Sequence, residues 1–460
     1  WYRGGTAIGN VDVDAGFEYV PVASDGSGAV SRNVIVNCGQ DSTFRGNESA
    51  GSNKDANDIG LFSMAVPTDA KAVCTANLPE PTLGPNSAEH VSDHFQGIEY
   101  TGDDGSTQAI TGEGFQPDLV WHKESSSGTG AFFSMDSSRG AQIYLKIPAT
   151  DNEVDSSGDL YTSFDSDGFT VGTDDVSNKN GDVYVAYCWK MNGGSETTND
   201  ASATGIGNED STHQANTTAR QAIVKFQSTL TSDYGETGTP RTMAHGMGTK
   251  PDWVITRSRD GGSYVHWNVW HPGYQPDTTY QNYQLFGLQN AGASNNAGWS
   301  RTDTGFSTTV FTHPRYQYVE NSKNYINYLW TELEGYSKFG GYEGNGNDSG
   351  ITIYLGFKPR MIILKSASAS SSFTSWVVVD SLRGSNTNTG AGTNPLYLNQ
   401  EAAEGKRGNG STDLSGNSVA MDFLSYGFKL RDNATEFNQD GTEYIYMAFS
   451  EMPFKYAQAS

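Results

Sequence analysis

The sequence predicts an all-β protein made of tandem β-sandwich or jelly-roll-like domains. Hydrophobic residues are only 35% of the chain but aromatic residues reach 12%, and Gly, Ser, Thr, Asn and Asp fill much of the rest. This composition is typical of short strands joined by many polar turns. No long stretch combines a 3.6-residue apolar period with helix caps. The 460 residues are enough for several domains of ordinary size.

A proline followed by an apolar strand that ends in a basic residue occurs three times. The three pairs are Pro117 with Lys123, Pro251 with Arg257, and Pro359 with Lys365. Proline at the first position of a strand removes no ladder hydrogen bond, because no partner needs its missing N–H. The recurrence therefore predicts three equivalent strands that each begin at the proline.

Two further boxes follow each of these strands in the same order. The second is Gly-Phe after a polar turn, at 168–169, 305–306 and 427–428. The glycine supplies a turn geometry that other residues resist. The third is an apolar strand that contains tyrosine, starting near Tyr184, Tyr325 and Tyr444. Its weak polar alternation predicts a strand that is buried on both faces.

The boxes divide most of the chain into three repeated β modules. Module 1 comprises residues 95–192, module 2 residues 219–334 and module 3 residues 337–457. Residues 193–218 contain few large apolar side chains, so we predict a Gly/Ser/Thr/Asn-rich linker there. Residues 1–82 are predicted to be the C-terminal part of another β-sandwich domain, followed by a proline-rich joint.

Charge and hydropathy exclude several partners. Asp and Glu number 53 against 29 Lys and Arg, for a formal net charge of -24, so a nucleic acid backbone would be repelled. The sequence has no apolar run of the roughly 18 residues that span a bilayer, so we expect no membrane insertion. The start at Trp1, without a signal segment, suggests that the polypeptide extends further upstream.

No motif indicates catalysis, and we predict a protein that is not an enzyme and has no catalytic residues. The nucleophile elbow, the His-Glu-x-x-His zinc motif and the phosphate-binding loop are all absent. Asp165 and Asp167 before Gly168 could hold calcium, but the corresponding turns of the other modules keep the glycine without the acids. A hairpin turn is the better interpretation, so we expect no cofactor and no metal, with calcium as the alternative.

Two turns share the pattern Asp-Ser-x-Arg-Gly, at 136–140 and 380–384. An aspartate and an arginine three residues apart could clamp a substrate. Recurrence in two modules instead favours a structural turn whose charges pair locally. Module 2 has Trp270-His271-Pro272-Gly273 in the corresponding region.

The aromatic residues of module 2 supply the candidates for ligand contact. They are Trp270, Tyr274, Tyr283, His313 and Arg315. Aromatic rings with polar edges suit sugars, because the C–H face of a sugar packs on the ring while its hydroxyls form hydrogen bonds. We expect these side chains to line a contact surface for a glycan or a neighbouring chain. The alternative is that they cap the core of their own module.

The boxes resemble those of a known group of proteins. The segments Gly114–Trp121, Ser166–Phe169, Gly181–Ala186 and Pro453–Ala457 are similar to the tandem repeat of structural proteins from tailed marine bacteriophages, such as cyanophages and pelagiphages. Module 2 departs from this pattern, since it lacks Ser-Asp-Gly-Phe. The N-terminal region, especially 37–46 and 72–79, resembles the last strands of a concanavalin-like (SPRY-type) sandwich.

The resemblance implies a virion structural protein: a tail fibre, a tail-associated adhesin or a surface-decorating fibre. Such a protein would mediate host-surface attachment or particle assembly, at the virion surface or extracellularly. Its expected partners are further copies of itself, other virion proteins and a host-surface glycan. The alternative is a secreted, lectin-like carbohydrate-binding protein, and a polysaccharide hydrolase with dispersed carboxylates comes third.

Overall fold

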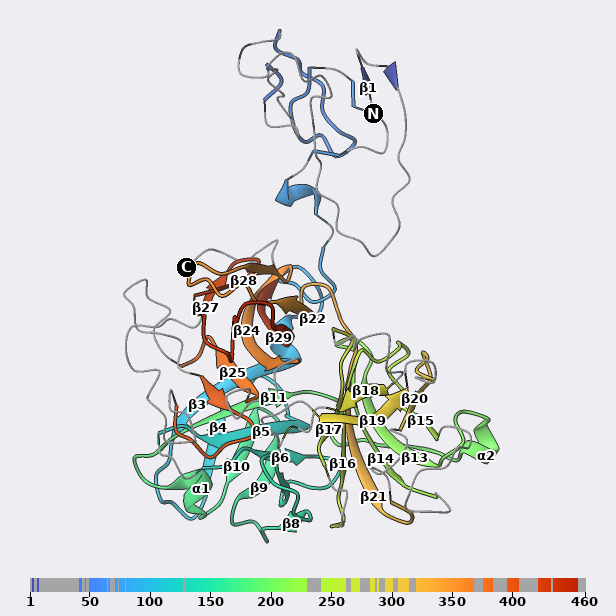
Figure 1. Ribbon diagram of the computed structural model, residues 1–460, viewed down its shortest axis with the longest axis vertical. Coiled ribbons are helices and arrows are strands. Elements are labelled where there is room, and N and C mark those ends of the chain that lie inside the picture. The colour runs from blue at the N-terminus through green and yellow to red at the C-terminus, as the bar shows by residue number, and fades with distance from the viewer. Residues whose placement is uncertain are drawn as a thin grey trace. The chain divides into compact units, whose positions relative to one another are not determined.

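The computed structural model divides the chain into two compact units, residues 1–80 and 81–460 (Figure 1). In the second unit it describes residues 81–126, 130–229, 241–261, 266–273, 282–285, 288, 294–300, 305–313, 320–367, 375–383, 395–404, 421–431 and 433–453. In the first it describes residues 2–3, 6–7, 41–43, 46, 49–63, 65–66, 71–72, 74–78 and 80. The two units are described separately below.

In the first unit, Asp55 organises the described backbone. Its Oδ1 accepts hydrogen bonds from the N–H groups of Asn57 and Ile59, both at 2.9 Å, and its Oδ2 accepts from Ala72 N at 2.8 Å and Asn77 Nδ2 at 2.6 Å. Desolvation opposes ionisation, but these donors prevail and lower the pKa of Asp55 to about 2. The regular elements here are short: β1 (Tyr2–Arg3), β2 (Thr6–Ala7) and the 3-10 turn η1 (Thr75–Asn77). The SPRY-type resemblance stays a prediction.

The fold is all-β, as predicted, and the second unit contains three large antiparallel sheets, one in each module. In spatial order, module 1 has β3 (Phe95–Thr101), β11 (Val183–Trp189), β5 (Leu119–Glu124), β6 (Phe133–Asp136), β7 (Ile143–Lys146) and β8 (Val154–Asp155). The sheet of module 2 has β12 (Thr197–Asn199), β13 (Ser211–Asn216), β14 (Gln221–Gln227), β21 (Asn324–Trp330), β16 (Trp253–Ser258) and β17 (Asn268–Trp270). That of module 3 has β22 (Ser337–Glu343), β29 (Glu443–Pro453), β24 (Phe357–Ser366), β25 (Val377–Asp380) and β26 (Leu396–Tyr397).

Each module also has a small sheet. These are β4 (Gln108–Thr111), β10 (Gly168–Val171) and β9 (Tyr161–Asp165); β15 (Thr242–Ala244) and β20 (Val310–Thr312); and β23 (Thr352–Tyr354), β28 (Gly427–Leu430) and β27 (Met421–Leu424). β18 (Asn282–Leu285) and β19 (Ser294–Ser300) form a separate pair. The helical elements are η2 (Val91–Asp93), α1 (Asp175–Asn178) and α2 (Ala201–Thr204). An apolar cluster in each module joins residues of its large and small sheets, as in a sandwich.

The strand of the third box lies beside the strand of the first box in every module. Their registers correspond: Trp189 pairs with Leu119, Trp330 with Trp253, and Phe449 with Met361. The prediction that the strands begin at the prolines needs correction. β5 and β16 begin two residues after their prolines, and Pro359 lies inside β24 at a register shift. A bulge leaves a residue outside the ladder, so proline is tolerated there.

The third-box strands are buried on both faces, as predicted. In β11, Ala186 and Cys188 belong to the core between the two sheets of module 1. Tyr187 and Trp189 belong instead to a second core that all three modules share. Side chains of a strand alternate between its faces, so one strand serves both cores.

The shared core is rich in aromatic rings. Trp189 contacts Trp330 with ring centroids 5.9 Å apart and Phe449 at 5.6 Å, while Trp253 stacks on Trp330 at 4.2 Å. The three modules thus lie side by side within one compact unit (Figure 1). Whether their backbones superpose stays a prediction.

The predicted linker at 193–218 is wrong, because this range contains β12, α2 and β13, and two of these strands extend the sheet of module 2. Its polar side chains are ordered by hydrogen bonds. Asp200 caps α2 by accepting from Ala203 N at 3.0 Å. Gln214 Nε2 donates to the hydroxyls of Ser137 and Ser138, both at 2.7 Å. The linker was predicted because the segment has few apolar side chains to bury, but side-chain hydrogen bonds also order a segment of the chain.

Candidate functional site

A buried charged network joins module 1 to module 2. Arg139 Nε donates to Asp136 Oδ2 at 2.6 Å, and the hydroxyl of Tyr328 donates to the same oxygen at 2.7 Å. The side chains of Asp136 and Arg139 are fully buried. Burial alone would lower the pKa of Arg139, but the charge of Asp136 raises it above its usual range. The local pairing expected for this turn is confirmed, and it extends to the neighbouring module.

Module 3 forms the same network with module 1. Arg383 Nη2 donates to Asp380 Oδ2 at 2.6 Å, and Tyr187 OH donates to that oxygen at 2.5 Å. Tyr187 and Tyr328 occupy corresponding positions in their strands, opposite Trp121 and Ile255. The same hydroxyl–carboxylate contact thus occurs at two junctions.

At the third junction, between modules 2 and 3, His271 takes the place of the aspartate. Its Nε2 lies 2.9 Å from the carbonyl oxygen of Tyr446, and its Nδ1 accepts from Gly273 N at 3.0 Å. This pattern fixes a neutral imidazole that carries its proton on Nε2. Complete burial lowers the pKa of His271 to about 3. With this contact, each of the three modules forms a junction hydrogen bond with both of the others.

The basic residues that close the first-box strands are buried too. Lys123 Nζ lies 5.5 Å from the ring centre of Phe132, Arg257 Cζ 5.7 Å from Trp267, and Lys365 Nζ 6.0 Å from Trp376. Desolvation lowers the three pKa values to about 8, 10 and 7, respectively. Their depth in the fold indicates cation–π packing and not a reactive surface amine.

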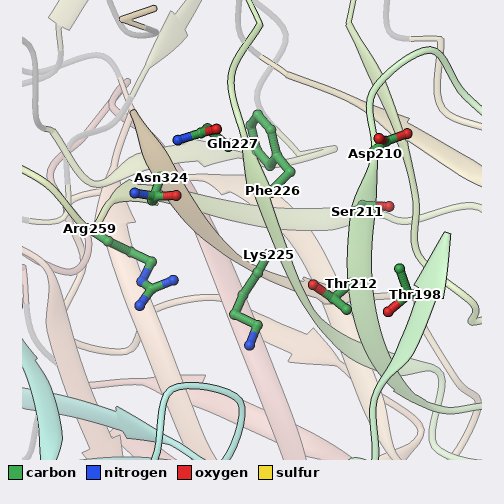
Figure 2. A pocket seen from close by; sticks show the side chains of 9 residues that line it. All are labelled: Thr198, Asp210, Ser211, Thr212, Lys225, Phe226, Gln227, Arg259 and Asn324. Carbon is green, nitrogen blue, oxygen red and sulfur yellow. The ribbon is translucent and has the colours of Figure 1, made fainter. Parts of the chain in front are cut away.

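Within the residues that the structure describes, a candidate ligand site is an open pocket of about 310 Å³ on module 2. Its walls come from β12, β13, β14 and β21 and from Arg259, which directly follows β16. Figure 2 shows Lys225 between Arg259 on one side and Thr212 and Thr198 on the other. Because β12 and β13 belong to the range 193–218, the supposed linker supplies part of this wall.

Ion pairs hold both cations of the pocket in place. Lys225 Nζ lies 2.8 Å from Glu196 Oε1 and donates to the carbonyl oxygen of Ser138 at 2.6 Å. Arg259 donates to both carboxylate oxygens of Glu153, at 2.9 and 2.8 Å. A bidentate pair fixes the guanidinium orientation. The pocket therefore presents positioned polar groups whose charges are largely balanced.

The side chains of the pocket offer polar, charged and aromatic contacts to a ligand. The nine lining residues include hydroxyl, amide and aromatic side chains but neither histidine nor cysteine. They therefore form no nucleophile–imidazole pair of the kind used in covalent catalysis. Hydroxyls, amides and one aromatic edge match the hydrogen-bonding needs of a small polyhydroxylated ligand.

The comparison with protein families matches residues 90–453 to one continuous domain. The chain belongs to the DUF7483 family, a domain of unknown function. The matched range includes nearly all of the three modules and the connections between them, in agreement with the single compact unit. No curated protein and no solved structure matches the chain.

Of the five residues predicted from the sequence to contact a ligand, Trp270 and His313 have neighbours in the described part of the DUF7483 domain. Trp270 ends β17 and packs edge-to-face on Phe306, with centroids 5.5 Å apart. His313 is buried and lies 4.9 Å from both Phe226 and Tyr325, centroid to centroid. Both side chains thus contact the core of module 2, and Phe226 connects His313 to the pocket wall.

The other candidates cannot be placed in this way. Tyr274 and Arg315 lie outside the described residues, and Tyr283 belongs to β18 with its side chain outside the description. A contact role for these five residues stays a prediction. Sequence reasoning missed Lys225, Arg259, Glu153 and Glu196, because ordinary charged residues that are distant in sequence give no motif.

The described part of the DUF7483 chain contains neither a cluster suited to a metal ion nor a membrane-spanning helix. Among the described residues, no three or more His, Cys, Asp or Glu side chains gather as a metal site. Asp165 and Asp167 instead bind neighbouring hydroxyl and N–H groups, including Thr170 Oγ1 at 2.6 Å and Gly114 N at 2.7 Å. Over the same described residues, no helix has the length and apolar character to cross a bilayer.

Proposed function

We propose that this chain is a non-enzymatic structural protein of a phage virion: a tail fibre, a tail-associated adhesin or a surface-decorating fibre. The observation that carries the proposal is the way the three modules are joined. The charged groups most like catalytic residues, such as Asp136, Arg139 and Asp380, are buried and bonded across the module junctions. A catalytic carboxylate must reach its substrate, whereas these hold the modules together.

A role in host-surface attachment agrees with the surface chemistry of module 2. The pocket around Lys225 and Arg259 has polar side chains fixed in place beside Phe226. Pre-positioned groups lose little freedom when a ligand binds. A host glycan is therefore the ligand class that we expect, and assembly with other virion proteins is the second part of the role.

Immunolabelling of intact phage particles tests the proposal. An antibody raised against residues 81–460 should label the particle surface in electron micrographs. The purified chain should release no reducing sugar from host polysaccharide over a prolonged incubation, with a known glycosidase as positive control. Particles that lack the label, or a steady release of reducing ends, would overturn the structural role.

The second candidate is a secreted carbohydrate-binding protein, which the same pocket would serve equally well. The two candidates differ in where the chain is found. A lectin-like protein would be recovered from culture fluid free of particles, whereas a virion protein would sediment with them. Quantitative immunoblotting of both fractions after particle purification separates the two.

A further inference from the structure

The loop before the first-box strand buries one side chain at the same place in every module. This residue lies four positions before the proline, and in chain order it is Glu113, Met247 and Leu355. The three side chains are 2%, 1% and 4% exposed. The glycine that follows has a positive φ in each module, of 78°, 72° and 81°. Module 1 thus places a carboxyl group where the other two modules place an apolar side chain in the same backbone geometry.

The apolar residues show what this position does in the fold. Met247 and Leu355 belong to the clusters that join the two sheets of their modules. Glu113 lies between β4 and β5, and neither oxygen of its carboxyl group forms a hydrogen bond with the described residues. Burial of a polar group without a hydrogen bond is unfavourable. Module 1 therefore carries an ionisable group at a core position that an apolar side chain fills elsewhere.

Four elements bring polar or charged groups toward the carboxyl of Glu113. They contribute the thiol of Cys188 on β11, the hydroxyl of Tyr161 on β9, Asp167 in the turn before β10, and Arg360 on β24 of module 3. Burial raises the pKa of Glu113 to about 7, and Asp167 adds to this shift, while Cys188 and Arg360 oppose it only in part. A thiol is a weak donor, so an ionised Glu113 would be poorly stabilised where it lies.

The same short loop is also held from its solvent side. Asp167 is exposed, and its carboxylate accepts from Gly112 N at 3.2 Å and from Gly114 N at 2.7 Å. These two glycines flank Glu113 in the sequence. A negative charge on Glu113 would therefore lie close to the carboxylate that holds the loop, and like charges repel.

We propose that Glu113 makes the closure of the loop at residues 112–114 sensitive to pH. While it carries its proton, the carboxyl stays in the core beside Cys188, as Met247 and Leu355 do in their modules. When the proton is lost, the carboxylate moves into water and the loop opens, whereas the loops of modules 2 and 3 stay closed. This inference does not depend on the virion role proposed above.

Proton linkage gives the direction of the effect. The pKa of Glu113 rises from 4.5 to about 7 in the closed loop, so the closed state binds the proton more tightly than an open, solvated state does. Closure is therefore strongest below pH 4.5 and weakens as the pH rises through 7.

Hydrogen exchange of the full chain, followed by mass spectrometry, tests the proposal. The exchange rate of the peptide at residues 112–118 in wild type is divided by that in Glu113→Leu at the same pH, which cancels the chemical effect of pH on exchange. This ratio should rise on the order of 10-fold between pH 5.5 and 8.5. Glu113→Gln, which keeps the shape of the protonated carboxyl group but cannot ionise, should give the same rise when it replaces Glu113→Leu as the reference.

The loops around Met247 and Leu355 are matched controls within the same molecule. Their exchange ratios should stay constant over the same pH range. A constant ratio at residues 112–118 would overturn the inference. An equal rise in all three loops would also overturn it, because the whole fold and not this loop would then respond to pH.

Discussion

The junction between modules 1 and 2 and the junction between modules 2 and 3 occupy corresponding places but use different chemistry. The first has the ion pair of Asp136 and Arg139, completed by Tyr328. The second has the neutral imidazole of His271 against the backbone oxygen of Tyr446. Met447 stands where the other modules have their tyrosine, and a thioether cannot donate to a carboxylate.

The comparison shows that a charged side chain is stable in the buried junction only when every one of its hydrogen-bonding partners is present. An aspartate at position 271 would face Met447 and would find no hydroxyl donor. A histidine needs one acceptor and one donor, and the backbone supplies both. At His271, the sequence departure of module 2 is therefore matched by Met447 in place of tyrosine on the partner module.

The largest effect should follow from Asp136→Ala, which leaves Arg139 buried without its carboxylate. Loss of one partner of a buried ion pair costs about 3–5 kcal/mol. Denaturant unfolding should report this loss as a lower midpoint. Asp422→Ala, which removes the part-exposed partner of Arg431, should cost less than about 1 kcal/mol. Equal losses for the two variants would contradict the distinction between buried and surface pairs.

His271→Asp tests whether the aspartate of the other junctions works at this one. We expect a loss of about 3 kcal/mol at pH 7, because the new carboxylate cannot donate to the Tyr446 carbonyl and would be buried unpaired. Adding Met447→Tyr supplies a hydroxyl at the position of Tyr328, so the double variant should recover part of the loss. A double-mutant cycle by urea unfolding measures this coupling, and a coupling of zero would refute the correspondence.

The His271 junction should also weaken in acid. The folded pKa of about 3 lies below the ordinary value of 6.5, so the unfolded state binds more protons below pH 6.5 and stability falls as pH falls toward 3. At pH 5.5 the contribution lost is about 1.4 kcal/mol. His122 and His245, with pKa values near 3 and 4, act in the same direction.

For that reason the pH measurement compares wild type with His271→Asn. Unfolding free energies from pH 7.5 to 4.5 should show a shallower slope in the variant, even if its stability at pH 7.5 is lower. Parallel curves would mean that protonation of His271 does not weaken the fold.

Among the changes at the buried junctions, the smallest loss at neutral pH should come from Tyr328→Phe, which removes one hydroxyl and leaves the ion pair of Asp136 intact. A single hydrogen bond to a charged group contributes roughly 1.5–3 kcal/mol, and the remaining bonds from Arg139 reduce the loss to the lower end. Tyr187→Phe should cost a similar amount, since Asp380 lies in the same environment. A clear difference between these two variants would show that the two charged junctions are not equivalent.

The sequence predicted the features that are local in the chain. The all-β class and the third-box strands with two buried faces, such as β11, followed from composition and periodicity. The pairing of Asp136 with Arg139 followed from a short motif. Periodicity does not reveal what covers a face, so the shared core of Trp189, Trp330 and Phe449 could not be predicted from it.

Two other features escaped prediction for related reasons. The strands at 193–218 are ordered by hydrogen bonds to residues such as Ser137, and composition does not report such partners. Arg259, which lines the pocket of module 2, pairs with Glu153 from module 1. Only the tertiary arrangement of the modules brings these residues together.

The shared core also has a consequence for synthesis of the protein. Trp189 and Trp330 emerge from the ribosome well before Phe449, yet all three pack together. Until β29 is made, an inner strand of the module 3 sheet is missing, and the faces of modules 1 and 2 that contribute to the shared core lack part of their cover. Contacts between such distant residues form slowly, so the nascent chain must protect an aromatic surface until β29 has been synthesised.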